Sequence, residues 1–521
     1  MPDRYDVLII GNGIAGSSAA LFLAEAGKSI LLLTKGEDLE DTNTAKAQGG
    51  IVFRGEGDNP SFLIKDIMEA SAFTSYTASA RLISRLGPPL VQKLLIDRLQ
   101  IPFDRRNGKW DLFREGNHSF RRILHVKDYT GKVIQEYLNK AVLHEPLIEV
   151  KKNSLALDLI VSSRDTPHPE SRYLPLECLG AYVWEEEAQE AIPILASATI
   201  LATGGLSEIY RYSSGGPWNT GDGFAIARRA GARLSNMEYV QFHPTLLYTP
   251  QYSSSFLISE SVRGEGAELI SANGEPFMYR YHPRGSLAPR DVVARAIFQE
   301  MKIHESNCVY LDFRQKMEPR KIKDTFPTIY EELLQRGIDI TQEPAPVAPG
   351  AHFSCGGVLT DTRGRTTIKR LYAAGEVACS GLHGANRLAS TSLLEGLTFG
   401  YRAARDIVKH SEELPNFAVL PFREKWGEPP PENILRSLKE IIRINMWENV
   451  GLIRERRGLS QSLQILTAMK KEIAHLKEEY GISPALLELE NMAETALLVT
   501  EEAFKNPLSR GTHFRLDAFD P

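Results

Sequence analysis

The sequence predicts an α/β protein with a Rossmann-type parallel sheet, an inserted α+β domain and a C-terminal helical domain. A strand, a glycine-rich turn and a helix open the chain, as they open a doubly wound sheet. Two later apolar strands also end in glycine turns, near residues 203 and 375. Between these turns the pattern changes, and amphipathic helices follow at the end. We expect the first domain to span residues 1–238 and 350–410, the inserted domain 239–349 and the helical domain 411–521.

The opening unit carries the first functional prediction. Its apolar run is short and bounded by glycine, which is typical of a buried parallel strand. Gly11 permits a sharp turn, Gly13 lets the backbone approach a pyrophosphate, and Gly16 lets the helix pack closely. The phosphates would lie at the helix N-terminus, beside Ile14 and Ala15, because unpaired N–H groups and the helix dipole attract anions. The unit predicts a bound dinucleotide; the alternative is a glycine-rich turn without a ligand.

The second strand, Ile30 to Leu33, lacks the acidic residue that usually holds the adenosine ribose. It ends in Thr34 and Lys35, and the first acid is Glu37. A lysine can contact phosphate or ribose, but it cannot accept a hydrogen bond from a ribose hydroxyl. This unit alone therefore leaves FAD and NAD open.

Composition excludes several classes of protein. A chain of 521 residues needs more than one hydrophobic core, and 42% hydrophobic with 24% charged residues gives no sign of disorder. The net charge of −5 and the lack of a long basic cluster argue against nucleic acid as a partner. The four cysteines lie far apart, so we expect neither disulfides nor a metal centre. The first strand begins near residue 5 and no apolar run could span a bilayer, so we expect a cytoplasmic protein without a signal peptide or a membrane partner.

Two polar segments look like ligand-facing loops. The first is glycine-rich and resembles a loop laid across a ligand, although an ordinary connection is the simpler interpretation. Its candidate cofactor contacts are Thr42, Asn43, Thr44, Ala47, Gln48, Gly49 and Gly50. The second, residues 113–125, carries three arginines and two histidines, which indicates either anion handling or a solvated loop.

Two acidic residues follow strand ends, where a parallel sheet binds its ligands. Asp222 and Glu376 could accept hydrogen bonds from the hydroxyls of a ribityl chain, although such residues are more often helix caps or turn residues. A further helix begins near Ser390. Its N-terminus, with Ser392 and Leu393, would point at a flavin ring and stabilise the negative charge of the reduced form.

The remaining segments are predicted to be connecting segments and helices. The mixed segment in the middle ends in Pro344-Ala-Pro346-Val-Ala-Pro349-Gly350, which predicts a hinge-like stretch. Residues 415–431 are linker-like, and residues 432–506 have the periodicity of amphipathic helices.

Many motifs in one order resemble a known family. They are Gly11 to Gly16, Ala47 to Gly50, Gln241-Phe-His243-Pro244, Glu260-Ser-Val-Arg263-Gly, Ala288-Pro-Arg290-Asp291, His352, His383 to Glu395, Met446 to Gly451 and Ser509 to His513. This set is similar to the succinate dehydrogenase and fumarate reductase flavoprotein superfamily, and within it most similar to the L-aspartate oxidases. The resemblance covers nearly the whole chain. It implies an FAD-binding Rossmann-type domain, an inserted capping domain and a C-terminal helical domain.

The resemblance also implies a clamp for a four-carbon dicarboxylate. Arg387 and His352 would hold one carboxylate, and His243 and Ser259 the other. Arginine suits this task because its guanidinium fork binds a carboxylate through two bonds and stays charged. The family often has threonine where this chain has Ser259, and the hydroxyl is retained. A lone histidine would more often be a satisfied core residue, but several clamp candidates in matching motifs favour a site.

Arg290 is the residue that the resemblance assigns to proton transfer. Arginine alone is a poor base because its pKa exceeds about 12, so it needs a carboxylate beside it. Glu260 and Arg263, three residues apart on one helix, would form a relay to solvent. The alternative for this pair is a plain surface salt bridge.

The function implied is FAD-dependent oxidation of L-aspartate to iminoaspartate, with oxygen or fumarate reoxidising the flavin. This is the first step of de novo NAD biosynthesis, and quinolinate synthase would take the unstable imine. The near alternative is a soluble fumarate reductase or a succinate dehydrogenase-type flavoprotein. A catalytically silent FAD protein is the alternative from another class, and the joint presence of the clamp and relay residues argues against it.

Two residues separate these alternatives. Membrane-bound relatives usually link the flavin to a histidine at the position of Asn43, so we expect non-covalent FAD. Glu115 would bind the substrate ammonium group, which succinate lacks, and the nearby basic residues would keep it ionised. The alternative is that Glu115 only pairs with Arg121 or Arg122.

Overall fold

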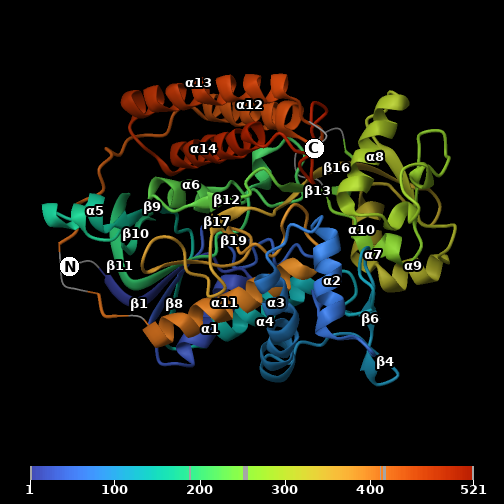
Figure 1. The fold of residues 1–521 in the computed structure, drawn as a ribbon, viewed down its shortest axis with the longest axis horizontal. Helices are drawn as coiled ribbons and strands as arrows, with labels where there is room; N and C mark the ends of the chain where they lie inside the picture. The colour runs from blue at the N-terminus through green and yellow to red at the C-terminus, as the bar shows by residue number, and fades with distance from the viewer. Residues whose placement is uncertain (1–2, 187–188, 250–255, 411, 415–417, 519–521) are drawn as a thin grey trace.

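A computed structural model describes residues 3–186, 189–249, 256–410, 412–414 and 418–518. Figure 1 shows three layers with the inserted segment at one end. Helices α1, α4 and α11 lie on one side of a central sheet, and α6 with the C-terminal helices lies on the other. Among the described residues, no helix is both long and apolar enough to cross a lipid bilayer.

The central sheet is parallel in its core. Its strand order is β8-β2-β1-β11-β10-β9, and β18 also pairs with β11. Strands β1, β2, β8, β11 and β18 run parallel, whereas β10 is antiparallel to both of its neighbours. The strands are β1 (Asp3–Ile10), β2 (Ile30–Leu33), β8 (Ile148–Lys151), β9 (Ala156–Val161), β10 (Cys178–Glu185), β11 (Glu190–Leu201) and β18 (Leu371–Ala373).

Side chains of β1 alternate between two hydrophobic clusters, so the strand is buried on both faces as its apolar run predicts. Val7 and Ile9 pack with α1 and α11, whereas Leu8 and Ile10 belong to the cluster that contains the C-terminal helices. The helices of the first part of the chain are α1 (Ile14–Ala24), α2 (Pro60–Ala70), α3 (Thr77–Leu90), the π-helix η1 (Val91–Arg98), α4 (Thr130–Leu143), α5 (Ser162–Asp165), η2 (Pro169–Tyr173), η3 (Ser207–Ile209) and α6 (Asp222–Arg229).

Short strands complete this part of the molecule and form small sheets. They are β3 (Ile51–Val52), β4 (Arg105–Arg106), β5 (Lys109–Trp110), β6 (Leu112–Phe113), β7 (Ile123–Leu124), β12 (Leu234–Ser235), β17 (Gly357–Leu359) and β19 (Ala378–Cys379).

The inserted segment has its own antiparallel sheet, of order β13-β16-β15-β14, and its own hydrophobic cluster. Its elements are β13 (Val240–Leu247), α7 (Glu260–Gly264), β14 (Glu268–Ile270), η4 (Met278–Arg280), η5 (Gly285–Leu287), α8 (Arg290–Ile303), β15 (Val309–Asp312), α9 (Pro319–Thr325), α10 (Pro327–Gln335) and β16 (Ala345–Ser354). A separate core is what lets such a segment pack as a unit beside the central sheet.

The expected hinge at 344–350 is wrong. Most of this stretch lies in β16, between β13 and β15. Its prolines fit there because each removes only its own N–H donor. Pro349 lies at the register shift between the His243 and Leu246 pairings, and the Pro346 carbonyl still accepts from the Tyr248 N–H. The chain therefore crosses the expected domain boundary as a continuous strand.

The C-terminal helices are where the periodicity predicts them, and the central sheet lies beneath them. Leu435, Met446 and Val499 share one buried cluster with Leu8 of β1. Residues 418–431 form no helix or strand, and residues 415–417 of the expected linker lie outside the described residues. The last helices are α11 (Thr391–His410), α12 (Glu432–Val450), α13 (Arg456–Tyr480) and α14 (Pro484–Lys505).

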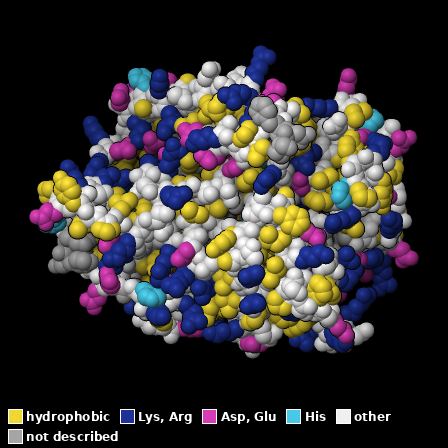
Figure 2. All heavy atoms as spheres, in the orientation of Figure 1, with side chains coloured by type: hydrophobic (Ala, Val, Ile, Leu, Met, Phe, Trp, Pro, Cys, Tyr) yellow, Lys and Arg dark blue, Asp and Glu magenta, His cyan; other side chains and the backbone are white. Residues whose placement is uncertain are grey.

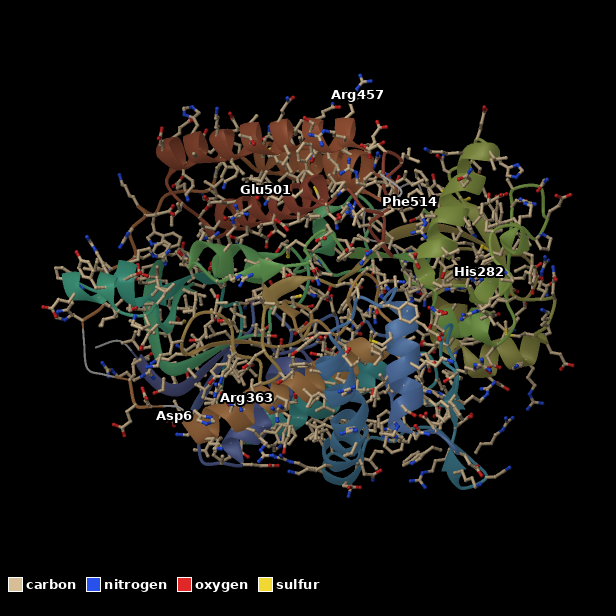
Figure 3. All side chains as sticks on the ribbon, viewed as in Figure 1. Asp6, His282, Arg363, Arg457, Glu501 and Phe514 are labelled. Carbon is tan, nitrogen blue, oxygen red and sulfur yellow. The ribbon has the colours of Figure 1, made fainter. Side chains whose placement is uncertain are left out.

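The C-terminal tail runs back toward the inserted segment. Phe514 lies between the C-terminal helices and α8 in Figure 3, and the Arg295 guanidinium stacks over its ring at 5.1 Å. On the face in Figure 2, basic and acidic side chains are interspersed, in keeping with the net charge of −5.

Candidate active site

One open cleft of about 1700 Å³ collects almost every residue that the sequence singles out. It lies at the carboxyl ends of β1, β2, β11 and β18, where an open parallel sheet binds ligands. Its predicted lining residues are Gly11, Gly13, Ile14, Ala15, Lys35, Thr42, Asn43, Thr44, Ala47, Gln48, Gly49, Gly50, Glu115, Asp222, His243, Ser259, Glu260, Arg290, His352, Glu376, Arg387, Ser392 and Leu393. Gly16 and Arg263 are outside this lining; Gly16 packs on Gly11, and Arg263 lies beside Glu260.

Arg290 and Glu260 form a buried ion pair inside the cleft. The Nε of Arg290 donates to Oε2 of Glu260 at 2.6 Å, and Arg263 lies 3.7 Å from the same carboxylate. The Gly116 N–H donates to the other oxygen of Glu260 at 3.0 Å. Burial opposes ionisation of Glu260, but the two arginines outweigh it and lower the pKa of this carboxyl group. Because Glu260 and Arg263 are each only 2% exposed, the alternative of a surface salt bridge is wrong.

Gln241, to which the sequence gave no role, joins the two functional arginines. Its Oε1 accepts from Arg290 NH1 at 3.1 Å, and its Nε2 donates to the Arg387 carbonyl at 2.9 Å. The residue lies in a quoted motif, but its sequence position alone gave no sign of these contacts.

Arg387 is a buried cation without a carboxylate partner among the described residues. Its NH2 donates to Nε2 of His352 at 2.9 Å, and Nδ1 of His352 lies 2.7 Å from the Ser214 hydroxyl. Burial lowers the pKa of Arg387 to about 10, so it remains charged at neutral pH, and its Nε has no hydrogen-bond partner. Such a group stabilises a bound anion.

His243 and His352 are held neutral. Their rings meet edge to face with centroids 5.1 Å apart. Burial, followed by the neighbouring arginines, lowers the pKa of both His243 and His352 well below its usual value. A neutral imidazole has one N–H donor. In His243 the Nδ1 atom accepts from the Thr245 N–H at 3.3 Å, so Nε2 carries the hydrogen and can donate to a substrate carboxylate. Both ring nitrogens of His352 already contact Arg387 and Ser214, so His352 can donate to a carboxylate only in place of one of these contacts. Ser259 lines the same cleft and begins α7, where its hydroxyl accepts from the Ser261 hydroxyl at 2.9 Å.

Glu115 faces the cleft, but its surroundings differ from the sequence expectation. Its Oε2 accepts from the Ser390 hydroxyl at 2.6 Å, and it is 3% exposed. Burial, and then the negative charge of Glu260, raises the pKa of Glu115. The basic residues of its own loop, which were expected to keep it ionised, do not pair with it, because no ion pair joins Glu115 to a described residue; Arg290 and Arg387 only partly offset the effect of burial.

The arginines of the 113–125 segment have other partners, so the pairing alternative for Glu115 is also wrong. Arg121 lies 3.6 Å from Glu265. Arg122 is fully buried between Asp58 and Asp66, at 3.1 and 3.0 Å. Neither sequence interpretation therefore applies to the whole segment. Arg122 is neither solvated nor available to an anion, because its ion pairs with Asp58 and Asp66 fix the loop that carries Glu115.

The sequence of this chain is similar to those of known flavoproteins. The FAD binding domain family matches residues 6–393, and the family of the fumarate reductase flavoprotein C-terminus matches residues 439–520. The L-aspartate oxidase of Yersinia pestis is 41% identical over 524 residues, covering 98% of this chain and 96% of the relative. The L-aspartate oxidase of Vibrio cholerae is 39% identical and covers 99% and 96% of the two chains. This chain belongs to the L-aspartate oxidase family.

Solved structures agree with this assignment. A quinol-fumarate reductase with menaquinol molecules matches with a TM-score of 0.85 and 26% identity, covering 99% of this chain and 93% of that chain. Mycobacterium smegmatis Sdh1 in complex with UQ1 matches with a TM-score of 0.80 and 29% identity, covering 99% and 89%. The L-aspartate oxidase family member described here thus has the FAD-binding, capping and C-terminal domains of these flavoproteins.

The cofactor is FAD, which settles the choice that the first unit left open. A Cβ on Gly11, at φ +109°, would lie 2.2 Å from the Ala202 carbonyl oxygen. A Cβ on Gly16 would lie 1.9 Å from the Gly11 oxygen, so only glycine lets α1 come this close to β1. Gly13, the residue before α1, has no side chain to cap the helix, and only the first N–H, that of Ile14, donates to a described side chain, the Thr44 hydroxyl at 3.0 Å. The N-terminus of α1 lines the cleft and can bind a phosphate there.

Unpartnered polar atoms in the cleft also fit this cofactor. Asn43 Oδ1, Gln48 Oε1 and Trp218 Nε1 are buried, line the cleft and have no hydrogen-bond partner. Buried polar groups are costly unless a partner satisfies them, so a polar ligand is the natural complement of this surface.

Lys35 and Asp222 form an ion pair that the sequence did not predict. The Nζ of Lys35 donates to Oδ2 of Asp222 at 2.6 Å and to the Thr220 hydroxyl at 2.8 Å. Burial opposes ionisation of Asp222, but Lys35 and the surrounding hydrogen bonds outweigh it and lower its pKa. The lysine thereby favours the ionised form of Asp222, which is a hydrogen-bond acceptor at the wall of the cleft.

Glu376 is a buried carboxyl group with few partners. The Asn43 Nδ2 donates to it at 3.2 Å and the Ser354 N–H at 3.0 Å, yet burial raises its pKa to about 7.

Glu376→Gln is expected to flatten the pH dependence of stability in the FAD-free protein. Because the pKa rises from 4.5 to about 7 on folding, the native state holds a proton that the unfolded state has lost in this range. The free energy of unfolding therefore falls as pH rises from about 4.5 to 7, by at most about 3 kcal/mol. Urea unfolding at both ends of this range measures the effect. An equal fall in wild type and variant would contradict the assignment.

Proposed function

We propose that this chain oxidises L-aspartate to iminoaspartate and that oxygen or fumarate reoxidises its FAD. The observation that carries the proposal is the charge arrangement of the cleft. Within the described part of the chain, Arg387 is a buried cation that no carboxylate pairs with, and it shares one cavity with Glu115, a buried carboxyl group that no cation pairs with. An amino dicarboxylate carries the complementary charges on a short skeleton.

The substrate is held at three places. Arg387 and His352 bind one carboxylate, and His243 and Ser259 bind the other. Glu115, oriented by the Ser390 hydroxyl, accepts from the substrate ammonium group. A cation beside Glu115 favours its ionised form and offsets the effect of burial. When bound, FAD supplies the redox chemistry by accepting the hydride from Cα.

Arg290 holds the proton for the reaction with fumarate. Its contact with Glu260 lets the pair pass a proton that a lone guanidinium would not release. The proton goes to a substrate carbon, and Glu260 and Arg263 replace it from the protein side. In aspartate oxidation no proton has to reach carbon, so Arg290 there acts mainly through its charge.

The inserted segment excludes water from the reaction. It contributes His243, Ser259, Glu260 and Arg290 to the cleft, while Glu115 and Arg387 come from the FAD-binding part. The substrate is therefore enclosed between the inserted segment and the FAD-binding part, and movement of the inserted segment admits and releases the substrate. Residues 239–349 are the capping domain in this account, with 1–238 and 350–410 as the FAD-binding domain and 411–521 as the helical domain.

The cellular role follows from the product. Iminoaspartate hydrolyses readily in water, so a quinolinate synthase takes it up as the next step of de novo NAD biosynthesis. We infer a cytoplasmic location from the sequence. The second candidate is a soluble fumarate reductase or succinate dehydrogenase-type flavoprotein, which the fumarate half of the chemistry also permits. Glu115 favours the first candidate.

The flavin is expected to be non-covalent, because Asn43 occupies the linkage position. Its amide nitrogen donates to Asn219 Oδ1 at 3.1 Å and is a poor nucleophile. Precipitation of the holoenzyme with acid should leave all of the yellow colour in the supernatant. Flavin that stays in the washed pellet would show that a covalent link exists.

Steady-state turnover tests the proposed function. The holoenzyme is given L-aspartate, D-aspartate, succinate or L-glutamate in air, and hydrogen peroxide and oxaloacetate are measured. Only L-aspartate should yield both products in equal amounts. Turnover of succinate with no turnover of L-aspartate would favour the second candidate.

A further inference from the structure

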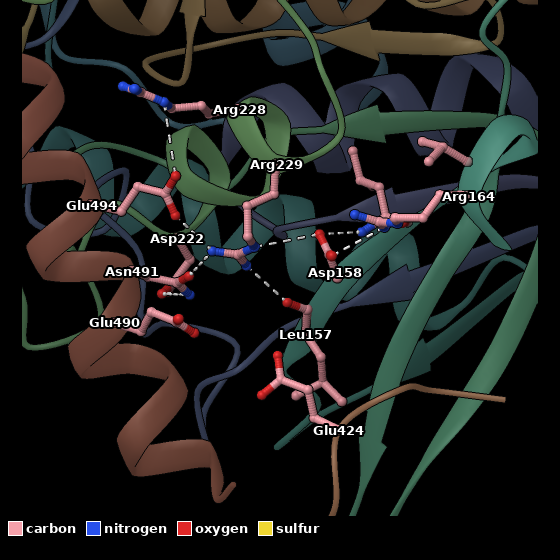
Figure 4. Close-up of polar contacts among 12 residues, drawn as sticks. Leu157, Asp158, Arg164, Asp222, Arg228, Arg229, Glu424, Glu490, Asn491 and Glu494 are labelled. Atoms are coloured by element: carbon pink, nitrogen blue, oxygen red, sulfur yellow. Dashed lines mark hydrogen bonds and ion pairs between the residues drawn. The ribbon is translucent and has the colours of Figure 1, made fainter. Parts of the chain in front are cut away.

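Helix α14 of the C-terminal unit contacts two residues that line the FAD cleft, Lys35 and Asp222. Figure 4 shows Asn491 between Asp222 on one side and Arg229 on the other. Its Nδ2 donates to Oδ1 of Asp222 at 2.8 Å, and its Oδ1 accepts from Arg229 NH1 at 2.8 Å. Asn491 is almost fully buried. Its amide is therefore fixed in one orientation, with the donor toward the cofactor-side carboxylate.

The arginine that orients Asn491 is itself held from several sides. Arg229 lies 3.2 Å from Glu494 and 3.6 Å from Asp158, and it donates to the Leu157 carbonyl at 3.1 Å, as Figure 4 shows. These partners come from both α14 and β9. The network ties the C-terminal helix to the central sheet at the edge of the cleft.

A second residue of α14, Glu488, contacts the lysine of the Lys35–Asp222 ion pair. Glu488 lies 3.1 Å from the Nζ of Lys35, and Lys439 of α12 holds Glu488 at 2.7 Å. Further along α14, the Thr495 hydroxyl donates to the Gly221 carbonyl at 3.0 Å. Three residues spaced along one face of α14 thus contact the segment around Asp222 and its lysine.

We propose that α14 is part of the FAD site, with Asn491 the positioning residue of Asp222 and Glu488 that of Lys35. This inference rests on the proposed function only in that FAD is the ligand. Oδ2 of Asp222 already accepts from Lys35 and from the Thr220 hydroxyl, at 2.6 and 2.9 Å, whereas Oδ1 accepts only from Asn491 among the described residues. A carboxylate oxygen can accept a second hydrogen bond, so Asp222 presents the remaining lone pair of Oδ1 to the cofactor in one direction. FAD affinity and the docking of α14 are coupled, and the coupling is reciprocal.

The test measures FAD affinity rather than activity alone. Asn491→Ala removes the donor to Asp222, and Asn491→Asp replaces it with a carboxylate. We expect the Kd for FAD, from quenching of flavin fluorescence, to rise about tenfold in the first and more in the second. At saturating FAD, kcat with L-aspartate should stay within about twofold, because neither variant touches the substrate clamp. Glu488→Gln should raise the Kd less. Because the Glu488 side chain is half-buried and glutamine has nearly the same shape, this variant leaves no cavity and tests the proposal in a protein that still folds.

Asn445→Ala is the matched control. Asn445 is a buried asparagine of α12 that bonds Ser462 at 2.9 Å and lies away from Asp222. It should lower Tm without changing the Kd. In wild type, FAD should also slow hydrogen exchange in α14, and this slowing should be lost in Asn491→Ala.

Two results would overturn the inference. One is an unchanged Kd in both the Asn491 and Glu488 variants; the other is an equal rise in the Asn445 control, which would make the C-terminal helices a general prop. A wild-type protein that binds no FAD would instead contradict the proposed function.

Discussion

Arg290→Leu is expected to lower fumarate reduction by about 10³-fold or more while FAD still binds. The side chain donates to Glu260 and Gln241. Its removal takes away the group that we propose to give a proton to carbon. Aspartate oxidation should fall less, because that reaction delivers no proton to carbon. Initial rates of both reactions on one preparation, with FAD content from its absorbance, measure the difference.

Arg280→Leu is the matched control for this substitution. Arg280 also lies in the inserted segment, but it pairs with Glu300 at 2.8 Å and is half exposed, outside the cleft. It should leave both rates near the wild-type values. Small and equal losses in the two reactions of Arg290→Leu would show that the relay assignment is wrong.

Glu115→Gln is expected to lower kcat/KM for L-aspartate by about 10²-fold, or roughly 2.7 kcal/mol. The carboxylate makes a charge-assisted hydrogen bond to the ammonium group, and a neutral amide cannot replace it. Fumarate turnover should stay the same or improve, because the change removes a negative charge beside a dianion. Both substrates are assayed on the one variant.

The control for Glu115 is Glu265→Gln. Glu265 pairs with Arg121 and Lys321 near the same loop but does not line the cleft. It should change neither activity by more than about twofold. If Glu115→Gln lowers both activities together, Glu115 is structural, and selection of aspartate over succinate must depend on other residues.

Local patterns predicted the local structure well. The second strand was expected at residues 30–33 and lies at Ile30–Leu33. Gly11 and Gly16 of the first turn are required by contacts of 2.2 and 1.9 Å. The amphipathic stretches after residue 432 form three helices as described. In each case the signal and the structure depend on residues close in sequence.

The incorrect or missing predictions have one physical cause. The residues that contact each other in these places lie far apart in the sequence. The proline-rich stretch before Gly350 looked like a hinge because strand neighbours β13 and β15 cannot be seen locally. The charge environment of Glu115 depends on Ser390 and Glu260, and that of Asp222 on Lys35. Sequence motifs named the candidate residues, whereas only the fold shows that most of them line one cleft and which of them form pairs.

Anaerobic mixing in a stopped-flow spectrophotometer tests the central claim most directly. The oxidised holoenzyme is mixed with L-aspartate or with succinate, and the flavin absorbance is followed over time. The account predicts rapid and complete loss of absorbance with L-aspartate, and a much slower loss with succinate. Absorbance that persists with L-aspartate, or bleaches equally with both compounds, would contradict a site built around the ammonium group of the substrate.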